Sequence, residues 1–333
     1  MVFVTGGTGL IGSHLLFELV QKEEKVRAIY RNPNAIDKVL KLFKYYNNDN
    51  SQFLFDKIEW VSCDILDVVT LDEVIKDCSD VYHCAALVSF HRNDFNQLMK
   101  INREGTANIV NACLDNNIRK LAYVSSTAAI GGANLADLVT EDLKWKQSEN
   151  TSGYAISKYS AEKEVWRGVE EGLDIVIVNP SVVIGAGNWN ESSLTIFKTI
   201  ENGLKFYTSG SNAFVDARDV TKTLVQLMES EIKNERFLCV GENAKFIDLF
   251  HLISKRINKK PPYILVQSWL ASLTWRVAAL VSLLTGKRST ITKESATSAF
   301  NVTKYSNTKI KTALNHEFYT LEQMVDNAVN GRL

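Results

Sequence analysis

Two side chains suited to proton transfer lie four residues apart in the segment Tyr154–Lys158. In a helix this spacing places a phenol and an ammonium group on one face. A free phenol has a pKa of about 10, and a neighbouring positive charge favours the phenolate. Ser126 follows a strand-like segment and supplies a hydroxyl that can donate a hydrogen bond. We expect Tyr154 to act as general acid and base, Lys158 to tune it, and Ser126 to orient a carbonyl group.

A glycine-rich turn near the N-terminus joins a strand-like segment to an amphipathic helical segment. Gly6 permits a tight turn, Gly9 allows the backbone to approach a pyrophosphate, and Gly12 allows the helix to pack close to the strand. The helix N-terminus would offer unpaired N–H groups to the phosphates. A purely structural turn is the alternative, but the strand–turn–helix context favours dinucleotide binding. The expected contacts are Gly6, Thr8, Gly9, Leu10, Ile11 and Gly12.

The end of the second strand-like segment bears on the choice between NAD and NADP. A carboxylate there would bind the ribose 2′-hydroxyl of NAD, whereas an arginine can accommodate the 2′-phosphate of NADP. Arg31 occupies this position, and Lys38 follows about two helical turns later. Charge-assisted contacts to a phosphate are worth roughly 1.5–3 kcal/mol each. We expect NADP (NADPH) to be preferred, with NAD as the alternative if both cations are solvated surface groups.

Strand-like and helical segments alternate through the first half of the chain, which predicts an α/β protein with a doubly wound parallel sheet of the Rossmann type. We expect residues 1–185 plus about 213–245 to form an NADP-binding domain. A smaller, mostly helical C-terminal lobe of about 186–212 plus 246–333 would bind the substrate. The expected strands are 2–5, 25–30, 58–62, 80–84, 120–124 and 174–178, and the expected helices are 10–21, 33–46, 71–77, 94–116 and 154–171.

The composition is that of a cytoplasmic protein with a small-molecule substrate. Lysine plus arginine and aspartate plus glutamate both total 38 among 333 residues, so no overall charge favours nucleic acid. The five cysteines have no metal-ligand spacing, and we expect no metal site. The stretch Tyr263–Leu284 is apolar, but Arg276 near its middle argues against a transmembrane span. We expect it to cover the substrate pocket, with contact to a membrane surface as the weaker alternative.

With these residues placed, the chain closely resembles the extended short-chain dehydrogenase/reductase family, within the NAD-dependent epimerase/dehydratase superfamily. The resemblance runs in order through residues 1 to about 220. It is carried by Thr5-Gly6-x-x-Gly9-x-x-Gly12, Asp64-Ile65, His83-Cys84-Ala85-Ala86, Asn102 to Thr106, Ser125-Ser126, Tyr154-x-x-x-Lys158, Asn179 to Gly185, and Phe214 to Val220.

The resemblance implies further site residues. Asn102 would bend its helix and hold a water molecule for a proton relay, although it could equally satisfy local backbone groups. Lys158 would hold the cofactor ribose and Tyr154 would lie beside the nicotinamide. Trp189, in the predicted substrate loop, is the best candidate for a substrate contact, and the five histidines are expected to be structural. The remaining expected cofactor contacts are Asp64, Ile65, Cys84, Ala85, Ala86, Ser125, Pro180 and Val183.

Departures from the family pattern indicate a branch. Members that dehydrate nucleotide sugars carry a Thr-Asp-Glu sequence where this chain has Ser126-Thr127-Ala128-Ala129. Nucleotide-sugar epimerases carry an arginine where this chain has Ser211-Asn212-Ala213, so a substrate diphosphate loses an anchor. The segment from Val26 to Pro33 is similar to that of the dihydroflavonol reductase and 3-beta-hydroxysteroid dehydrogenase-like branch.

The sequence thus predicts an NADPH-dependent reductase or dehydrogenase that interconverts a small, relatively apolar carbonyl compound and its alcohol. Tyr154 would be its general acid and base. The first alternative is a nucleotide-sugar epimerase with a tightly held cofactor. The second is a protein that binds NADP without turnover. Helices that flank the predicted sheet could also pair two copies of the chain as a homodimer.

Overall fold

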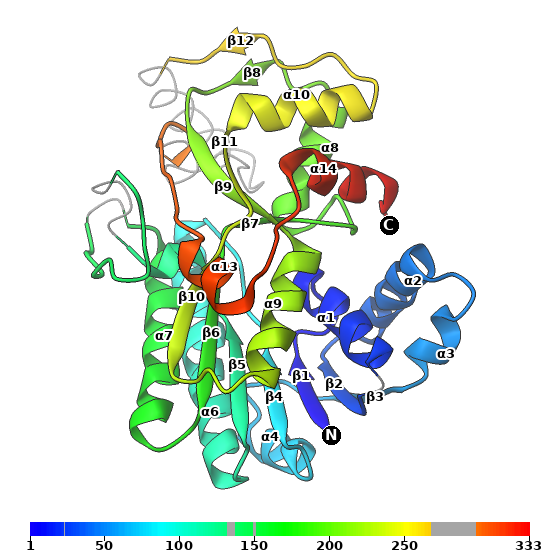
Figure 1. Cartoon of the computed structure of the whole chain (residues 1–333), viewed down its shortest axis with the longest axis vertical. Helices are drawn as coiled ribbons and strands as arrows, with labels where there is room; N and C mark the ends of the chain where they lie inside the picture. The colour runs from blue at the N-terminus through cyan, green and yellow to red at the C-terminus, as the bar shows by residue number, and fades with distance from the viewer. Residues whose placement is uncertain (23, 132–136, 149–150, 268–297) are drawn as a thin grey trace.

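The computed structural model describes residues 1–22, 24–131, 137–148, 151–267 and 298–333, and shows a parallel sheet with helices on both faces and a second lobe beyond one end (Figure 1). Within the described residues seven strands form this sheet in the order β10-β6-β5-β4-β1-β2-β3, and every neighbouring pair is parallel. The order reverses between β1 and β4, where a ligand crevice opens in folds of this kind. The expected doubly wound fold is confirmed. The strands are β1 (Val2–Thr5), β2 (Val26–Tyr30), β3 (Ile58–Ser62), β4 (Asp80–His83), β5 (Lys120–Val124), β6 (Ile175–Pro180) and β10 (Glu235–Cys239).

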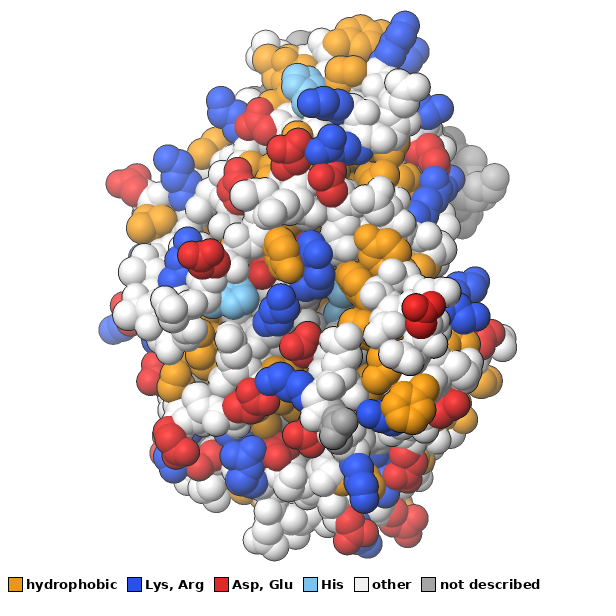
Figure 2. Space-filling model, turned by 45° about the vertical axis from the view of Figure 1, so that its right-hand side comes forward, with side chains coloured by type: hydrophobic (Ala, Val, Ile, Leu, Met, Phe, Trp, Pro, Cys, Tyr) orange, Lys and Arg blue, Asp and Glu red, His pale blue; other side chains and the backbone are white. Residues whose placement is uncertain are grey.

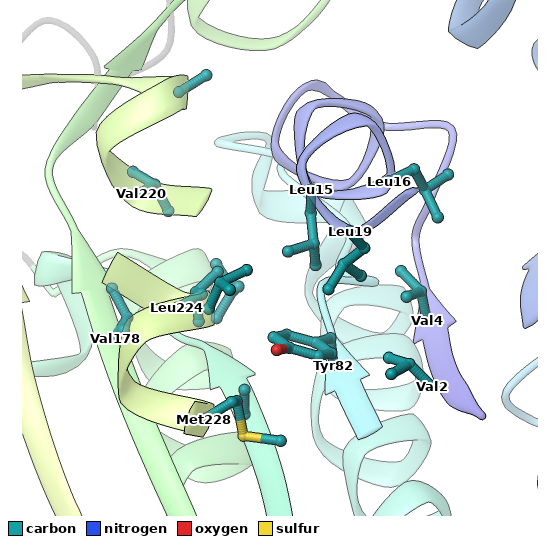
Figure 3. Close-up of a cluster of buried hydrophobic side chains, with 14 of the residues drawn as sticks. Val2, Val4, Leu15, Leu16, Leu19, Tyr82, Val178, Val220, Leu224 and Met228 are labelled. Carbon is teal, nitrogen blue, oxygen red and sulfur yellow. The ribbon is translucent and has the colours of Figure 1, made fainter. Parts of the chain in front are cut away.

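Alternating side chains of the buried strands supply two cores, one on each face of the sheet. On one face Val2 and Val4 of β1 pack under α1 (Leu10–Gln21), α2 (Ile36–Tyr46) and α9 (Ala217–Glu229). Figure 3 shows Leu15 and Leu19 of α1 directed toward Tyr82 of β4. On the other face Phe3 packs with α4 (Val68–Ile75), α6 (Gly105–Asp115) and α7 (Gly153–Glu170). The sheet is therefore covered on both sides, as a parallel sheet requires.

Two of the predicted helices differ from the observed ones for local reasons. Helix α4 begins at Val68, earlier than expected, because the Asp67 carboxylate accepts the Thr70 N–H at 3.2 Å and caps the helix. The segment expected as one helix over 94–116 is instead three successive pieces. They are α5 (Phe95–Leu98), a π-helical stretch (Met99–Glu104) and α6. A π-helical stretch changes which side chains face the neighbouring elements, and such stretches are frequent at functional sites.

The second lobe has its own small sheet and its own core. Its sheet has the order β11-β9-β7, and residues 213–216 and 242–245, which we expected in the nucleotide-binding domain, belong to it. Its core is built from Phe197, Phe214, Leu249 and Met324, all buried. Its elements are β7 (Val182–Ile184), α8 (Thr195–Glu201), β8 (Phe206–Tyr207), β9 (Ser211–Asp216), β11 (Glu242–Lys245), α10 (Phe246–Arg256), β12 (Ile264–Leu265) and α14 (Leu321–Asn330). Helix α13 (Thr308–Leu314) instead packs against β10 and α9, and α3 (Ser51–Phe55) lies in the first half.

The surface carries both signs of charge. On the face shown in Figure 2, Lys and Arg side chains are interspersed with Asp and Glu side chains rather than gathered into one field. This mixture agrees with the equal numbers of acidic and basic residues. Among the residues that the structure describes, no helix is both long and apolar enough to cross a membrane. Most of the apolar stretch Tyr263–Leu284, from residue 268 onward, lies outside the described residues.

A buried lysine joins the central sheet to the end of α9. Lys120, at the start of β5, is only 4% exposed. Its ammonium group donates to the carbonyl oxygen of Leu227 at 2.6 Å and to that of Ser230 at 2.9 Å. Both carbonyls lie at the C-terminal end of α9, where the helix leaves acceptors without partners of its own and where its dipole favours a cation. Lys120 therefore fixes α9 against β5.

We predict that Lys120→Met lowers the free energy of unfolding by about 1–3 kcal/mol, because two buried carbonyl groups lose a charged donor. Urea unfolding followed by circular dichroism measures the change. Lys233→Met is the matched control: its ammonium contacts Asp174 at 3.0 Å on the surface, with both side chains exposed. We expect that control to stay within about 0.5 kcal/mol of the parent protein. Equal effects of the two substitutions would contradict the role given to Lys120.

Candidate active site

The glycine-rich turn has the geometry that a dinucleotide phosphate requires. Gly6 has φ +68°, in the left-handed region, and a Cβ atom there would lie 2.6 Å from the Ala85 backbone nitrogen. A Cβ atom on Gly12 would lie 2.1 Å from the Gly6 carbonyl oxygen. Both positions therefore exclude any side chain. Helix α1 starts at Leu10 with Gly9 as its N-cap residue, and no side chain caps it. Its first N–H groups thus face a place where phosphate oxygens fit.

Arg31 and Lys38 lie at the far end of this crevice but differ in their surroundings. Arg31 directly follows β2 and is exposed. Lys38, on α2, forms an ion pair with Glu191 of the second lobe. Lys38 is therefore no isolated surface cation. It joins the nucleotide-binding half to the second lobe, and its ammonium would have to leave Glu191 to meet a phosphate.

The structure brings the tyrosine and the serine together. Helix α7 begins at Gly153, because the Ser152 side chain accepts the Ala155 N–H at 3.0 Å. Tyr154 therefore lies in the first helical turn, beside the residues that follow β5. The side chains of Tyr154 and Ser126 lie close enough for Ser126 to affect the pKa of the phenol. Burial raises the pKa of the Tyr154 phenol, and the Ser126 side chain opposes this rise.

Lys158 lies one turn further along α7, in the interior. It is 1% exposed, and its ammonium donates to the Tyr123 hydroxyl at 2.8 Å and to the Val124 carbonyl oxygen at 2.9 Å. Burial lowers the pKa of Lys158 to about 7, while Glu162 and Cys84 act in the opposite direction. A group with such a pKa can exchange its proton near neutral pH. Lys158 thus contacts the last two residues of β5, and Tyr154 lies beside Ser126, two residues after that strand.

The Asn102 side chain is held by protein groups. Its side-chain oxygen accepts the Leu87 N–H at 2.7 Å, and its amide nitrogen donates to the Leu87 carbonyl at 2.9 Å. The same amide nitrogen donates to the Ser157 hydroxyl at 2.9 Å. Its oxygen and its nitrogen each have protein partners. Asn102 ties the segment after β4 to α7, between Tyr154 and Lys158.

A histidine at the end of β4 completes the floor of the site. His83 is fully buried; its Nδ1 lies 2.7 Å from the Thr5 hydroxyl and its Nε2 lies 3.0 Å from the Thr106 hydroxyl. Burial, together with the nearby Lys158 charge, lowers the pKa of His83 to about 3. The imidazole is therefore neutral and joins β1, β4 and α6 beneath the crevice.

The other expected cofactor contacts lie near the glycine turn or follow the strands of the central sheet. Ala85 lies against Gly6, while Ser125 follows β5 and Pro180 ends β6. Asp64 accepts the Leu66 N–H at 3.0 Å. The Ile65 side chain is buried against Gly105 of α6, so only its backbone remains for a ligand. Burial raises the pKa of the Cys84 thiol to about 12, which leaves it protonated and unreactive. Ala86 follows Ala85, and Val183 of β7 is buried.

Trp189 does not face the crevice. It is 3% exposed in the core of the second lobe, its indole N–H donates to the Ala328 carbonyl at 3.1 Å, and Arg332 lies over its ring. Trp189 therefore holds α14 in place and does not serve as the substrate contact that we expected. A different aromatic side chain, which the sequence analysis did not select, is exposed beside Tyr154. Phe90, in the segment after β4, is 44% exposed and packs its ring edge-on against Tyr154, with 5.6 Å between ring centroids.

The parallel sheet, the glycine turn and the tyrosine–lysine pair define a dinucleotide-binding α/β enzyme. The chain belongs to the NAD dependent epimerase/dehydratase family, whose model matches residues 2–241. It is 29% identical over 271 residues to cinnamoyl-CoA reductase 1 of Petunia hybrida, covering 78% of each chain. It is 27% identical over 274 residues to a putative dihydroflavonol 4-reductase of Synechocystis, covering 80% of this chain and 76% of the relative. The resemblance to the dihydroflavonol reductase branch is confirmed.

A solved structure of UDP-glucuronic acid 4-epimerase from Bacillus cereus, in complex with UDP-glucuronic acid and NAD, has the same fold. It superposes with a TM-score of 0.77 at 20% identity, covering 99% of this chain and 98% of that chain. Family membership confirms dependence on a nicotinamide cofactor at the level of NAD or NADP.

We predict that the protein loses stability as the pH is lowered, because His83 stays neutral in the folded protein. Its folded pKa, about 3, lies below the 6.5 of an unfolded histidine, so the unfolded chain binds more protons between these values and stability is lost as the pH falls through this window. Between pH 7.5 and 5.0 this loss is roughly 2 kcal/mol. Urea unfolding at both pH values should show that His83→Gln removes about this much of the pH dependence. The exposed His251 is the control, and His251→Gln should leave the dependence as in the parent.

Proposed function

We propose that this protein is an NADPH-dependent reductase or dehydrogenase that interconverts a small, relatively apolar carbonyl compound and its alcohol. One observation carries the proposal: the Tyr154 phenol lies beside the Ser126 side chain, which opposes the rise in its pKa, one helical turn from the buried ammonium of Lys158. These are the groups needed to hold a carbonyl oxygen and to give it a proton. They lie at the edge of the sheet where the glycine turn would place the cofactor.

The residues act on the substrate oxygen in a defined order. When bound, the nicotinamide supplies or accepts hydride at the carbonyl carbon. Ser126 donates a hydrogen bond to the carbonyl oxygen, and Tyr154 delivers its proton to that oxygen as negative charge develops. The Lys158 ammonium stabilises the phenolate that remains, and its pKa of about 7 allows it to exchange a proton near neutral pH. In the oxidative direction the same groups remove the alcohol proton.

The choice of NADPH is supported by the end of β2. Arg31 is exposed where a carboxylate would select NAD, and Lys38 lies within the helix that follows. The choice of an apolar carbonyl substrate is supported by Phe90 and Val88, two exposed apolar side chains in the segment that adjoins Tyr154. The names of the relatives, which include reductases of cinnamoyl-CoA and dihydroflavonol, agree with reduction of a carbonyl group. An epimerase would need a cation for a diphosphate, and β9 begins with Ser211 and Asn212 instead.

We expect Tyr154→Phe to lower kcat for NADPH-dependent carbonyl reduction by on the order of 100-fold or more, because it removes the proton donor and keeps the ring. NADPH affinity, measured by fluorescence titration, should change little. Tyr159→Phe is the matched control on the same helix, since Tyr159 stacks its ring on Trp145 at 4.1 Å and that ring is kept. A Tyr154→Phe variant as active as the control would refute the proton-transfer role.

Arg31→Ala should weaken NADPH binding by roughly 10- to 100-fold and leave NADH binding within a few-fold, because only NADPH carries the 2′-phosphate. Isothermal titration with both cofactors measures the change. Lys44→Ala removes one exposed positive charge from the end of α2 and serves as the control for overall charge. Tighter binding of NADH than of NADPH by the parent protein would exclude the assigned preference.

A further inference from the structure

A carboxylate that the reaction scheme does not use lies in the interior beside the site. Glu162 continues the spacing of Tyr154 and Lys158 along α7 by one more turn, so the three side chains share a helix face. It is 2% exposed. A carboxylate is rarely buried to this degree unless charged and polar partners surround it. Its partners therefore indicate what it does.

Besides the Trp166 indole of its own helix, which donates to it at 3.5 Å, Glu162 has partners at three adjacent strands. One carboxylate oxygen accepts the Ser125 hydroxyl, after β5, at 2.7 Å and the Asn179 amide, in β6, at 2.9 Å. The other oxygen accepts the Arg236 guanidinium, in β10, at 3.0 Å. A single side chain of α7 is thus bound to β5, β6 and β10 together. This fixes both the rotation and the height of the helix against the sheet.

The contacts of Glu162 also extend to Ser126, the third group proposed to act on the substrate. The Asn179 amide that donates to Glu162 also donates to the Ser126 carbonyl oxygen at 3.0 Å. Glu162 is therefore linked through one side chain to Ser126, and along its own helix to Tyr154 and Lys158. A displacement of Glu162 would move all three groups relative to one another. Misplacement of reacting groups by about 1 Å can cost on the order of 100-fold in rate.

Glu162 also contributes charge at Lys158. The groups that face Lys158 are Tyr123 of β5, His83 and Cys84 at the end of β4, and Tyr154 and Glu162 of α7. Burial lowers the pKa of Lys158, and the Glu162 carboxylate raises it, ahead of Cys84. The Glu162 carboxylate is therefore the main group that offsets the effect of burial on the Lys158 ammonium.

We propose that Glu162 is the positioning residue of this active site, which fixes α7 against β5, β6 and β10 so that Tyr154, Lys158 and Ser126 stay in register. The inference rests on the proposed function for its consequence in turnover, but the contacts and the charge are properties of the chain itself. A buried ion pair that served stability alone would leave the turnover number of a folded variant unaffected. The titration of Lys158 tests whether the Glu162 charge acts on that ammonium, and turnover separates the two roles.

The first experiment follows the Lys158 ammonium directly. The protein is labelled with carbon-13 at lysine Cε, and the signal absent from Lys158→Met identifies Lys158. In Glu162→Gln we expect its titration midpoint to move to lower pH by on the order of one pH unit, because a neighbouring negative charge is lost. Glu164→Gln is the matched control: Glu164 lies on the same helix but pairs with Arg103 and Arg167 at the surface. Its midpoint should equal that of the parent.

A second variant tests the opposite sign and covers a failure of Glu162→Gln to fold. Arg236→Met keeps the carboxylate and removes the cation that neutralises it, so the Lys158 midpoint should move to higher pH. Unchanged midpoints in the folded variants would overturn the proposal. So would a shift of the same size in Glu164→Gln.

Turnover gives the second readout. Glu162→Gln should lower kcat for carbonyl reduction by roughly 10- to 100-fold with cofactor KM within a few-fold, and Glu162→Asp, which keeps the charge, should recover part of the loss. A thermal unfolding scan of each variant confirms that it is folded. Loss of thermal stability with kcat at the parental value would show a purely structural residue. If the parent reduces no carbonyl compound while the Lys158 midpoint still moves, the proposed function fails and the positioning role of Glu162 stands.

Discussion

An ammonium group held in the protein interior is the constraint around which this site is organised. Removing Lys158 from water disfavours its charged form, and the loss must be offset by partners on several sides. The chain meets this requirement with a phenol and a carbonyl from β5 and a carboxylate from its own helix. Each partner comes from an element that must itself be fixed. One requirement therefore relates the sheet order, the start of α7 and the buried polar network around Lys158. Together they keep a proton on a nitrogen atom that water does not reach.

The parts of the fold that depend on local sequence were predictable. Strands β1, β3 and β5 have the expected bounds because runs of β-branched and aromatic residues end at turn signals. The meeting of Tyr154 with Ser126 was predictable as well, since helix periodicity fixes one group and the end of a strand fixes the other. The glycine turn follows from backbone conformation at Gly6 and from close packing at Gly12. In each of these cases the deciding interaction lies within a few residues.

The rest depends on contacts between residues far apart in the chain, which no local pattern encodes. Trp189 is buried because α14, near the C-terminus, covers it. Lys38 has Glu191 as its partner across the two lobes, and Asn102 contacts Leu87 and Ser157 because a π-helical stretch carries it. Glu162 follows Lys158 by four residues, as Lys158 follows Tyr154, so the helical spacing that points to Glu162 was present in the sequence. Its meaning became visible only with Arg236, supplied by the last strand of the sheet.

The two lobes share more structure than a division into domains suggests. Residues of the C-terminal segment, among them Ile310 of α13, pack in the core under α1 and α9. On the crevice side, the Tyr46 hydroxyl of α2 donates to Asn327 of α14 at 3.2 Å. His14 of α1 lies 3.0 Å from the same hydroxyl, and burial lowers the pKa of His14 to about 4. A neutral imidazole, two hydroxyl-bearing rings and an amide therefore join the lobes without a net charge. Such a junction keeps its geometry across neutral pH, whereas Lys158, with a pKa of about 7, exchanges its proton in this range.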